Sequence, residues 1–174
     1  MPQVVLDTGA PKKRARLVGA GVVVLALVVI VGGFLAWKFL TVSTKEDTKA
    51  ALTKAQTKML DGKYDQAITD LKTQLKDAKT DEEKLTLYIG IGANYESKQD
   101  YPAALEAYKS GQALMETYGA DMSVARMAEK TGDTATALAN YQRCEAMIKD
   151  GKAKQHAGEL PGLEDKINRL GGKS

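Results

Sequence analysis

Residues 85–117 read LTLYIGIGANYESKQDYPAALEAYKSGQALMET. Apolar and small side chains recur there at helical spacing on both sides of a short polar turn. Asp100 is a good helix N-cap, and Pro102 is tolerated in the first turn of a helix, so a second helix is expected to begin after Asp100. The stretch therefore predicts two helices joined by a turn.

This helical hairpin has counterparts on either side of it. Three segments align, and their shared alanines, Ala67, Ala104 and Ala137, recur at similar intervals along the chain. The aligned segments are Gly62–Ile68, Gln99–Leu105 and Gly132–Leu138. A helix–turn–helix unit with a period of about 34 residues indicates a helical repeat protein.

The middle unit carries most of the residues that identify the repeat. They are Tyr88, Ile91, Gly92 and Tyr95 in its first helix, and Tyr101, Ala104 and Tyr108 in the turn and second helix. This pattern resembles the tetratricopeptide repeat (TPR) family. We expect the small residue Gly92 to let the facing helix approach at Ala104, while the aromatic rings fill the spaces between helices. Lys58 and Ala128 stand where the middle unit has Tyr95.

An unbroken apolar run of 21 residues, Leu17–Trp37, precedes the repeats. As a helix it would be roughly 32 Å long, enough for a hydrocarbon core of about 30 Å. The apolar part of a cleaved signal peptide is shorter, about 7–15 residues, and bulky Trp37 follows Ala36 where small residues would mark a cleavage site. Residues 17–40 are therefore predicted to be an uncleaved transmembrane helix in contact with the lipid bilayer.

The charges around this helix indicate its orientation. Four cations lie between Lys12 and Arg16, so residues 1–16 are expected to stay in the cytoplasm. The repeats would then lie on the extracytoplasmic side of a cell membrane. The reversed topology, with the repeats facing the cytosol, remains an alternative because Lys38, Lys45 and Lys49 follow the helix.

The predicted fold class is all-α: a single-pass transmembrane helix followed by a short TPR-like α-solenoid of about three repeats and a capping helix. The predicted parts are a basic head (1–16), the membrane helix (17–40), a linker (41–47), the repeats (48–81, 85–117 and 118–151), a capping helix (158–170) and a tail (171–174). Apolar Leu163, Ile167 and Leu170 give the capping helix one face for the open end of the stack.

Several residues are predicted to start helices. Ser43 with Glu46 and Thr80 with Glu83 can form capping boxes, and Asp133 can cap a second helix. A break at 118–120 places the start of the third unit at Asp121.

Charge and composition argue against several classes of function. The net charge of +3 resides in the basic head, because residues 48–174 contain 19 basic and 19 acidic side chains. The repeats therefore have no basic surplus for nucleic acid. The single cysteine, Cys144, is expected to be an inert packing residue, and His156 is expected to lie in a polar loop with no acidic or cysteine partner at ligand spacing. We predict no enzyme, no cofactor and no metal site.

The resemblance implies a binding groove, because the first helices of successive TPR units line a concave face that binds partner segments. The residues that map to this face are Leu52, Gln56, Met59, Leu60, Ile89, Ala93, Glu96, Met122, Arg126 and Glu129. The groove is predicted to be apolar with a polar margin, and its methionines could adapt to varied partners. The same residues could instead pack inside a small solenoid.

The predicted function is a membrane-anchored interaction module or scaffold that binds a protein or peptide, in layout similar to repeat proteins of secretion and envelope complexes. One alternative is a fixed structural subunit of a larger membrane complex. Another is a cytosol-facing receptor for targeting sequences, similar in layout to organellar import receptors.

Overall fold

The structure is a computed structural model that describes residues 45–171. The predicted head, the membrane helix at 17–40, the cap at Ser43 and residues 172–174 lie outside the described residues. Within 45–171, no helix is both long enough and apolar enough to cross a membrane.

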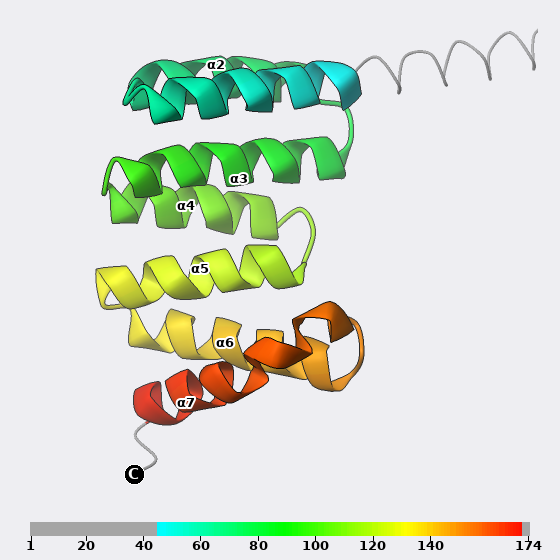
Figure 1. The fold of residues 1–174 in the computed structure, drawn as a ribbon, viewed down its shortest axis with the longest axis vertical. Helices are drawn as coiled ribbons and strands as arrows, with labels where there is room; N and C mark the ends of the chain where they lie inside the picture. The colour runs from blue at the N-terminus through cyan, green and yellow to red at the C-terminus, as the bar shows by residue number, and fades with distance from the viewer. Residues whose placement is uncertain (1–44, 172–174) are drawn as a thin grey trace, which may run out of the picture. The chain divides into compact units, whose positions relative to one another are not determined.

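Seven α-helices and one 3₁₀ helix make up the described residues. They are a helix over 45–60, α2 (Tyr64–Asp77), α3 (Asp81–Ser97), α4 (Tyr101–Gln112), α5 (Tyr118–Thr131), α6 (Thr134–Lys149), the 3₁₀ helix η1 (Lys154–Glu159) and α7 (Leu160–Leu170). Figure 1 shows that they stack in chain order as three helical hairpins, followed by η1 and α7. The predicted all-α arrangement of helical hairpins is confirmed for this part of the chain.

The turn inside each hairpin has one conformation. Gly62, Gln99 and Gly132 occupy it with φ angles of 72°, 65° and 80°, and each stands at the same place relative to the repeat alanine of its unit. The next residue donates its N–H to the carbonyl five residues back, as in Asp100 to Tyr95 at 2.9 Å and Asp133 to Ala128 at 2.9 Å. These bonds satisfy carbonyls at the helix end, as in a Schellman motif.

Most of the predicted helix starts are confirmed. Thr80 and Glu83 form a capping box, and the carboxylates of Asp100 and Asp133 accept backbone N–H groups. The prediction for the third unit is wrong, because α5 begins at Tyr118 and Thr117 caps it by accepting the N–H of Ala120. The supposed break at 118–120 is therefore the first turn of the helix.

Buried side chains form two core clusters. The first contains Leu71, Leu87 and Ile91, and the second contains Val124 and Tyr141. The second cluster extends from α4, which supplies Ala104, Leu105 and Tyr108, to Leu163 of α7, so the middle hairpin contributes to both cores.

Gly92 allows a close approach of α4, and the nearest group is the ring of Tyr108. A Cβ added at Gly92 would lie 2.6 Å from a ring carbon of Tyr108. Ala104, which lies one turn earlier on α4, is fully buried. The missing side chain at residue 92 thus makes room for an aromatic ring of the facing helix.

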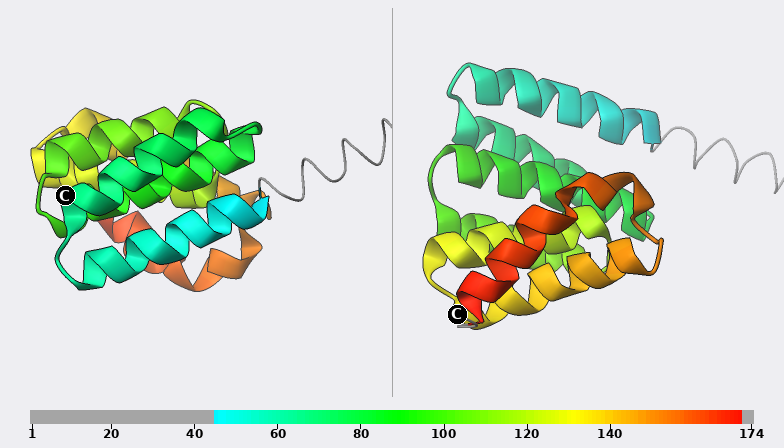
Figure 2. Two further views of the ribbon diagram at one scale, coloured as in Figure 1. Left: turned by 90° about the horizontal axis from the view of Figure 1, so that it is seen from above. Right: turned by 60° about the horizontal axis from the view of Figure 1, so that its bottom comes forward.

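The end of the solenoid is closed as expected, although the loop before α7 is more ordered than the sequence indicated. Residues Lys154–Glu159 form η1, and α7 then crosses α6 obliquely (Figure 2). Leu163 is buried, and Ile167 and Leu170 pack against the second core cluster. The apolar face of α7 therefore covers the core at this end.

Candidate functional site

The predicted groove residues lie in rows on the helix over 45–60, α3 and α5. We call this surface the first-helix face. Its apolar row consists of Leu52, Ile89 and Met122, which occupy equivalent positions in the three units. All three side chains are partly buried against the core. Leu52 also borders a hollow of about 310 Å³ between its own helix and the start of α3.

A second row, Gln56, Ala93 and Arg126, lies one helical turn further along. Gln56 and Arg126 are exposed, and Ala93 is partly exposed. Because Ala93 is small, the middle of this face is shallow and open.

The third row, Met59, Glu96 and Glu129, differs from the prediction because both carboxylates are held by the protein itself. Glu96 pairs with Arg126 and accepts the Tyr108 hydroxyl at 3.0 Å. The charged groups of the predicted polar margin are therefore largely bonded to other residues of the protein rather than free to meet a partner.

Glu129 has an equivalent set of partners on the next helices. It accepts the hydroxyl of Tyr141 at 2.7 Å, the Lys166 ammonium at 3.0 Å and the Arg169 guanidinium at 2.7 Å. The Tyr141 bond and the two α7 cations lower the pKa of Glu129. Burial, together with this carboxylate, raises the pKa of Tyr141. The bonds tie α5, α6 and α7 to one another.

One sequence signal could have revealed these two braces. In both units a glutamate is followed twelve residues later by a tyrosine, Glu96 by Tyr108 and Glu129 by Tyr141. In the first unit Met59 and Leu71 replace that pair. The thioether of Met59 instead accepts the Ser97 hydroxyl at 3.4 Å.

Leu60 does not belong to these rows. It is the last residue of its helix, it is 80% exposed, and its equivalent in the middle unit is the polar Ser97. The structure therefore does not bring Leu60 together with the other predicted groove residues in one apolar row.

Sequence reasoning missed a hollow on the opposite side of the hairpins. It has a volume of about 650 Å³, lies between α2 and α4, and is floored by α3. We call it the second-helix hollow. Its lining consists of Lys72, Leu75, Lys76, Tyr88, Ile91, Tyr95, Ala103, Glu106, Ala107 and Ser110. The walls are mainly apolar, with charged groups toward the rims.

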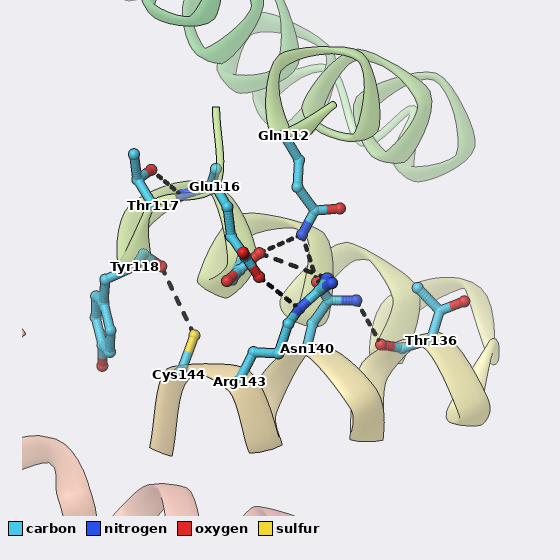
Figure 3. A network of polar contacts seen from close by, with 10 residues as sticks. Gln112, Glu116, Thr117, Tyr118, Thr136, Asn140, Arg143 and Cys144 are labelled. Atoms are coloured by element: carbon cyan, nitrogen blue, oxygen red, sulfur yellow. Dashed lines mark hydrogen bonds and ion pairs between the residues drawn. The ribbon is translucent and has the colours of Figure 1, made fainter. Parts of the chain in front are cut away.

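A group of polar side chains lies at the corresponding place among α4, α5 and α6 (Figure 3). We call Gln112, Asp121, Asn140 and Arg143 the polar network. The amide nitrogen of Gln112 donates to Asp121 and to the side-chain oxygen of Asn140, which also accepts from Arg143. Asp121, predicted to start the third unit, is fully buried.

Only one oxygen of the Asp121 carboxylate is bonded. Oδ1 accepts from Gln112 and lies 3.5 Å from the Arg143 guanidinium, whereas buried Oδ2 has no hydrogen-bond partner among the described residues. Burial raises the pKa of Asp121, although Gln112 and Arg143 oppose this effect. The network thus contains a buried carboxyl group with only one of its two oxygens hydrogen-bonded within residues 45–171.

Cys144 and His156 have structural surroundings. Cys144 is buried with its thiol 3.7 Å from the Tyr118 carbonyl, and burial raises its pKa to about 12. The ring of His156 stacks on Tyr118 at 4.0 Å, and its Nδ1 lies 2.8 Å from Glu159. His156 therefore has an acidic neighbour that sequence reasoning did not anticipate, because η1 brings Glu159 back to the ring.

No group of three or more potential metal-ligating side chains occurs within residues 45–171.

Comparisons with known proteins bear on the fold. No model of a known protein family and no curated protein matches this chain. Among solved structures, 12 chains match. One is the crystal structure of PcrH from Pseudomonas aeruginosa, which is 16% identical over 72% of this chain and 92% of that chain, with a TM-score of 0.58. Residues 45–171 form a TPR-like helical-repeat fold. At this identity, the likeness is one of fold.

Proposed function

We propose that this protein is a non-enzymatic interaction module, anchored in a membrane by residues 17–40, that binds a segment of a protein partner on its first-helix face. The apolar row of Leu52, Ile89 and Met122 would receive apolar side chains of the partner. Gln56 and the open surface at Ala93 would contact its backbone and polar groups.

The observation that carries this proposal is the register of the apolar row. Equivalent side chains on the first helices of three successive units are partly exposed on one face, which suits a partner segment that lies across these helices. A hollow beside Leu52 offers a place for one anchoring side chain.

The two glutamate braces support binding indirectly. They join α3 to α4 and α5, and α5 to α6 and α7, so the helices are held in position before a partner arrives. A preformed surface loses less conformational entropy on binding than a mobile one. Because Glu96, Arg126 and Glu129 are already engaged, we assign recognition to the apolar row rather than to these charges.

The anchor and its orientation are part of the same proposal. The apolar run Leu17–Trp37 and the cations before it support a head in the cytoplasm and repeats on the other side of the membrane. Confinement to a membrane raises the effective concentration of two membrane-bound partners, so modest affinity would suffice. Protease treatment of intact cells tests this orientation, and survival of the repeat domain would support the reversed topology.

Site-specific crosslinking in native membranes tests the face itself. A photo-crosslinking amino acid in place of Ala93 should form a discrete adduct, and one in place of exposed Ala139 on α6 should not. Combining the probe at residue 93 with Met122→Glu should abolish the adduct. Equal adducts at both positions, or an adduct that survives Met122→Glu in a protein of unchanged helicity, would contradict the proposal.

A further inference from the structure

The second-helix hollow is an open position within a repeating framework. Each residue position in its walls has an equivalent in the next repeat. By position in the repeat, α4 corresponds to α2, α5 corresponds to α3, and α6 corresponds to α4. The corresponding pairs are Leu75 and Gln112, Tyr88 and Asp121, Ala107 and Asn140, and Ser110 and Arg143. The later member of every pair belongs to the polar network.

The chain therefore fills the place between α4 and α6 with its own side chains and leaves the equivalent place between α2 and α4 open. Between α4 and α6, long and polar Gln112 and Arg143 meet over buried Asp121. Between α2 and α4, small Ala107 and Ser110 leave space of about 650 Å³ above Ile91 and between two tyrosines. The open space thus results from the local side chains and not from the helix arrangement alone.

The rims of the hollow carry charges of opposite sign. Lys72 and Lys76 belong to α2, and Glu106 belongs to α4. None of the ion pairs among the described residues involves Lys76 or Glu106. The Lys72 ammonium is held over the ring of Tyr95 at 5.4 Å and donates to its hydroxyl at 3.0 Å. One rim can therefore attract an acidic group, and the other can attract a basic group.

The dimensions match a short helix. The stretches that line the hollow on α3 and α4, Tyr88–Tyr95 and Ala103–Ser110, each span about two helical turns, or roughly 10 Å. Two apolar side chains four residues apart on a partner helix would lie within that length. An apolar groove is one recurring receptor for the apolar face of an amphipathic helix.

We propose that the second-helix hollow binds a short amphipathic helix of a protein partner. Two apolar side chains of that helix enter the hollow, an acidic residue faces Lys72 and Lys76, and a basic residue faces Glu106. This site is separate from the first-helix face, so the protein can hold two partner segments at once.

The test uses the full chain in detergent micelles and two fluorescently labelled 14-residue helical peptides of identical composition. Both present leucines at positions i, i+4 and i+7. In one peptide the glutamates lie along one flank and the lysines along the other, and in the second peptide the two residue types alternate on both flanks. Fluorescence anisotropy should show that the segregated peptide binds at least ten-fold more tightly, and Lys72→Glu with Lys76→Glu should remove that preference, because both rims are then acidic. Equal affinities would overturn the proposal.

Matched variants locate the bound peptide. Ser110→Arg introduces the side chain that fills the equivalent position at Arg143, and it should weaken binding at least ten-fold. Thr73→Arg changes an exposed residue on α2 outside the hollow and should leave binding unchanged. Circular dichroism confirms that both variants fold. Binding that survives Ser110→Arg, or that is lost in Ile89→Glu with Met122→Glu, would show that the peptide lies elsewhere and overturn the assignment.

Discussion

The places among α2, α3 and α4 and among α4, α5 and α6 share one backbone plan and differ in their contents. The first is an open apolar hollow, and the second is closed by a buried polar network. The helix packing is alike in both, so the difference comes from a few side chains such as Leu75 against Gln112 and Ser110 against Arg143. Repeats of the same fold can therefore differ in function, because side chains leave a hollow open in one unit and fill the equivalent place in the next.

The strongest test removes the central donor of the polar network. Gln112→Ala should cost about 2–3 kcal/mol of unfolding free energy, because buried Asp121 loses its hydrogen bond and keeps its desolvation penalty. Leu75→Ala, the equivalent change beside the hollow, should cost about 1 kcal/mol because Leu75 is only partly buried. Urea denaturation measures both values. Equal costs would mean that the two places do not differ as described.

A second comparison concerns the small residues that face the tyrosines. Gly92→Ala should cost about 1–2 kcal/mol, since its Cβ would meet the Tyr108 ring at 2.6 Å while the Tyr108 hydroxyl is bound to Glu96. The opposite change in the third unit, Ala125→Gly, should cost about 0.5–1 kcal/mol through helix propensity. Thermal unfolding measures both, and a stabilising effect of Gly92→Ala would contradict the close contact.

The turn residues give a smaller effect of opposite sign. Gln99 has a left-handed φ of 65° where the outer hairpins have glycine. Gln99→Gly should therefore stabilise the protein by up to about 1 kcal/mol. Gly132→Gln, the matched change in the third unit, should destabilise it by a similar amount. Both shifts are measurable as changes in the urea midpoint, and a loss of stability in Gln99→Gly would mean that Gln99 makes compensating contacts.

The smallest effects at neutral pH concern two carboxylates whose pKa values move in opposite directions. Asp121 has a raised pKa, so its contribution to stability falls as pH rises from about 4 toward that raised value. Glu129 has a lowered pKa, so its contribution is present above about 4.3 and is lost as pH falls through the lowered value. Unfolding at a series of pH values should show that Asp121→Asn and Glu129→Gln change this dependence in opposite senses. Changes of the same sign would contradict these assignments.

Local sequence patterns predicted the hairpins well. The capping box at Thr80 and the N-caps at Asp100 and Asp133 depend on residues within a few positions of one another, and the structure contains them. The same reasoning failed at Asp121, where a good capping residue lies three residues inside a helix that Thr117 already caps. Capping preference identifies Asp121 as a residue that can start a helix, but in the structure it is a buried residue inside α5.

The candidate site was predicted only in part. The first-helix face is where the repeat pattern indicated, and its apolar row is in register, whereas binding of a partner there stays a prediction. The glutamate braces and the second-helix hollow were not anticipated. Glu129 meets Arg169 across 40 residues, and the hollow depends on which side chains are absent from three separate helices. No local pattern contains this information.

The sequence by itself determined that residues 45–149 form successive helical hairpins, because turn conformation, capping and helical periodicity are set by neighbours along the chain. Only the tertiary structure decided which polar groups are buried together and where the surface stays open. Those outcomes depend on contacts such as Gln112 with Asn140, 28 residues apart, whose free energy is realised only when the helices stack.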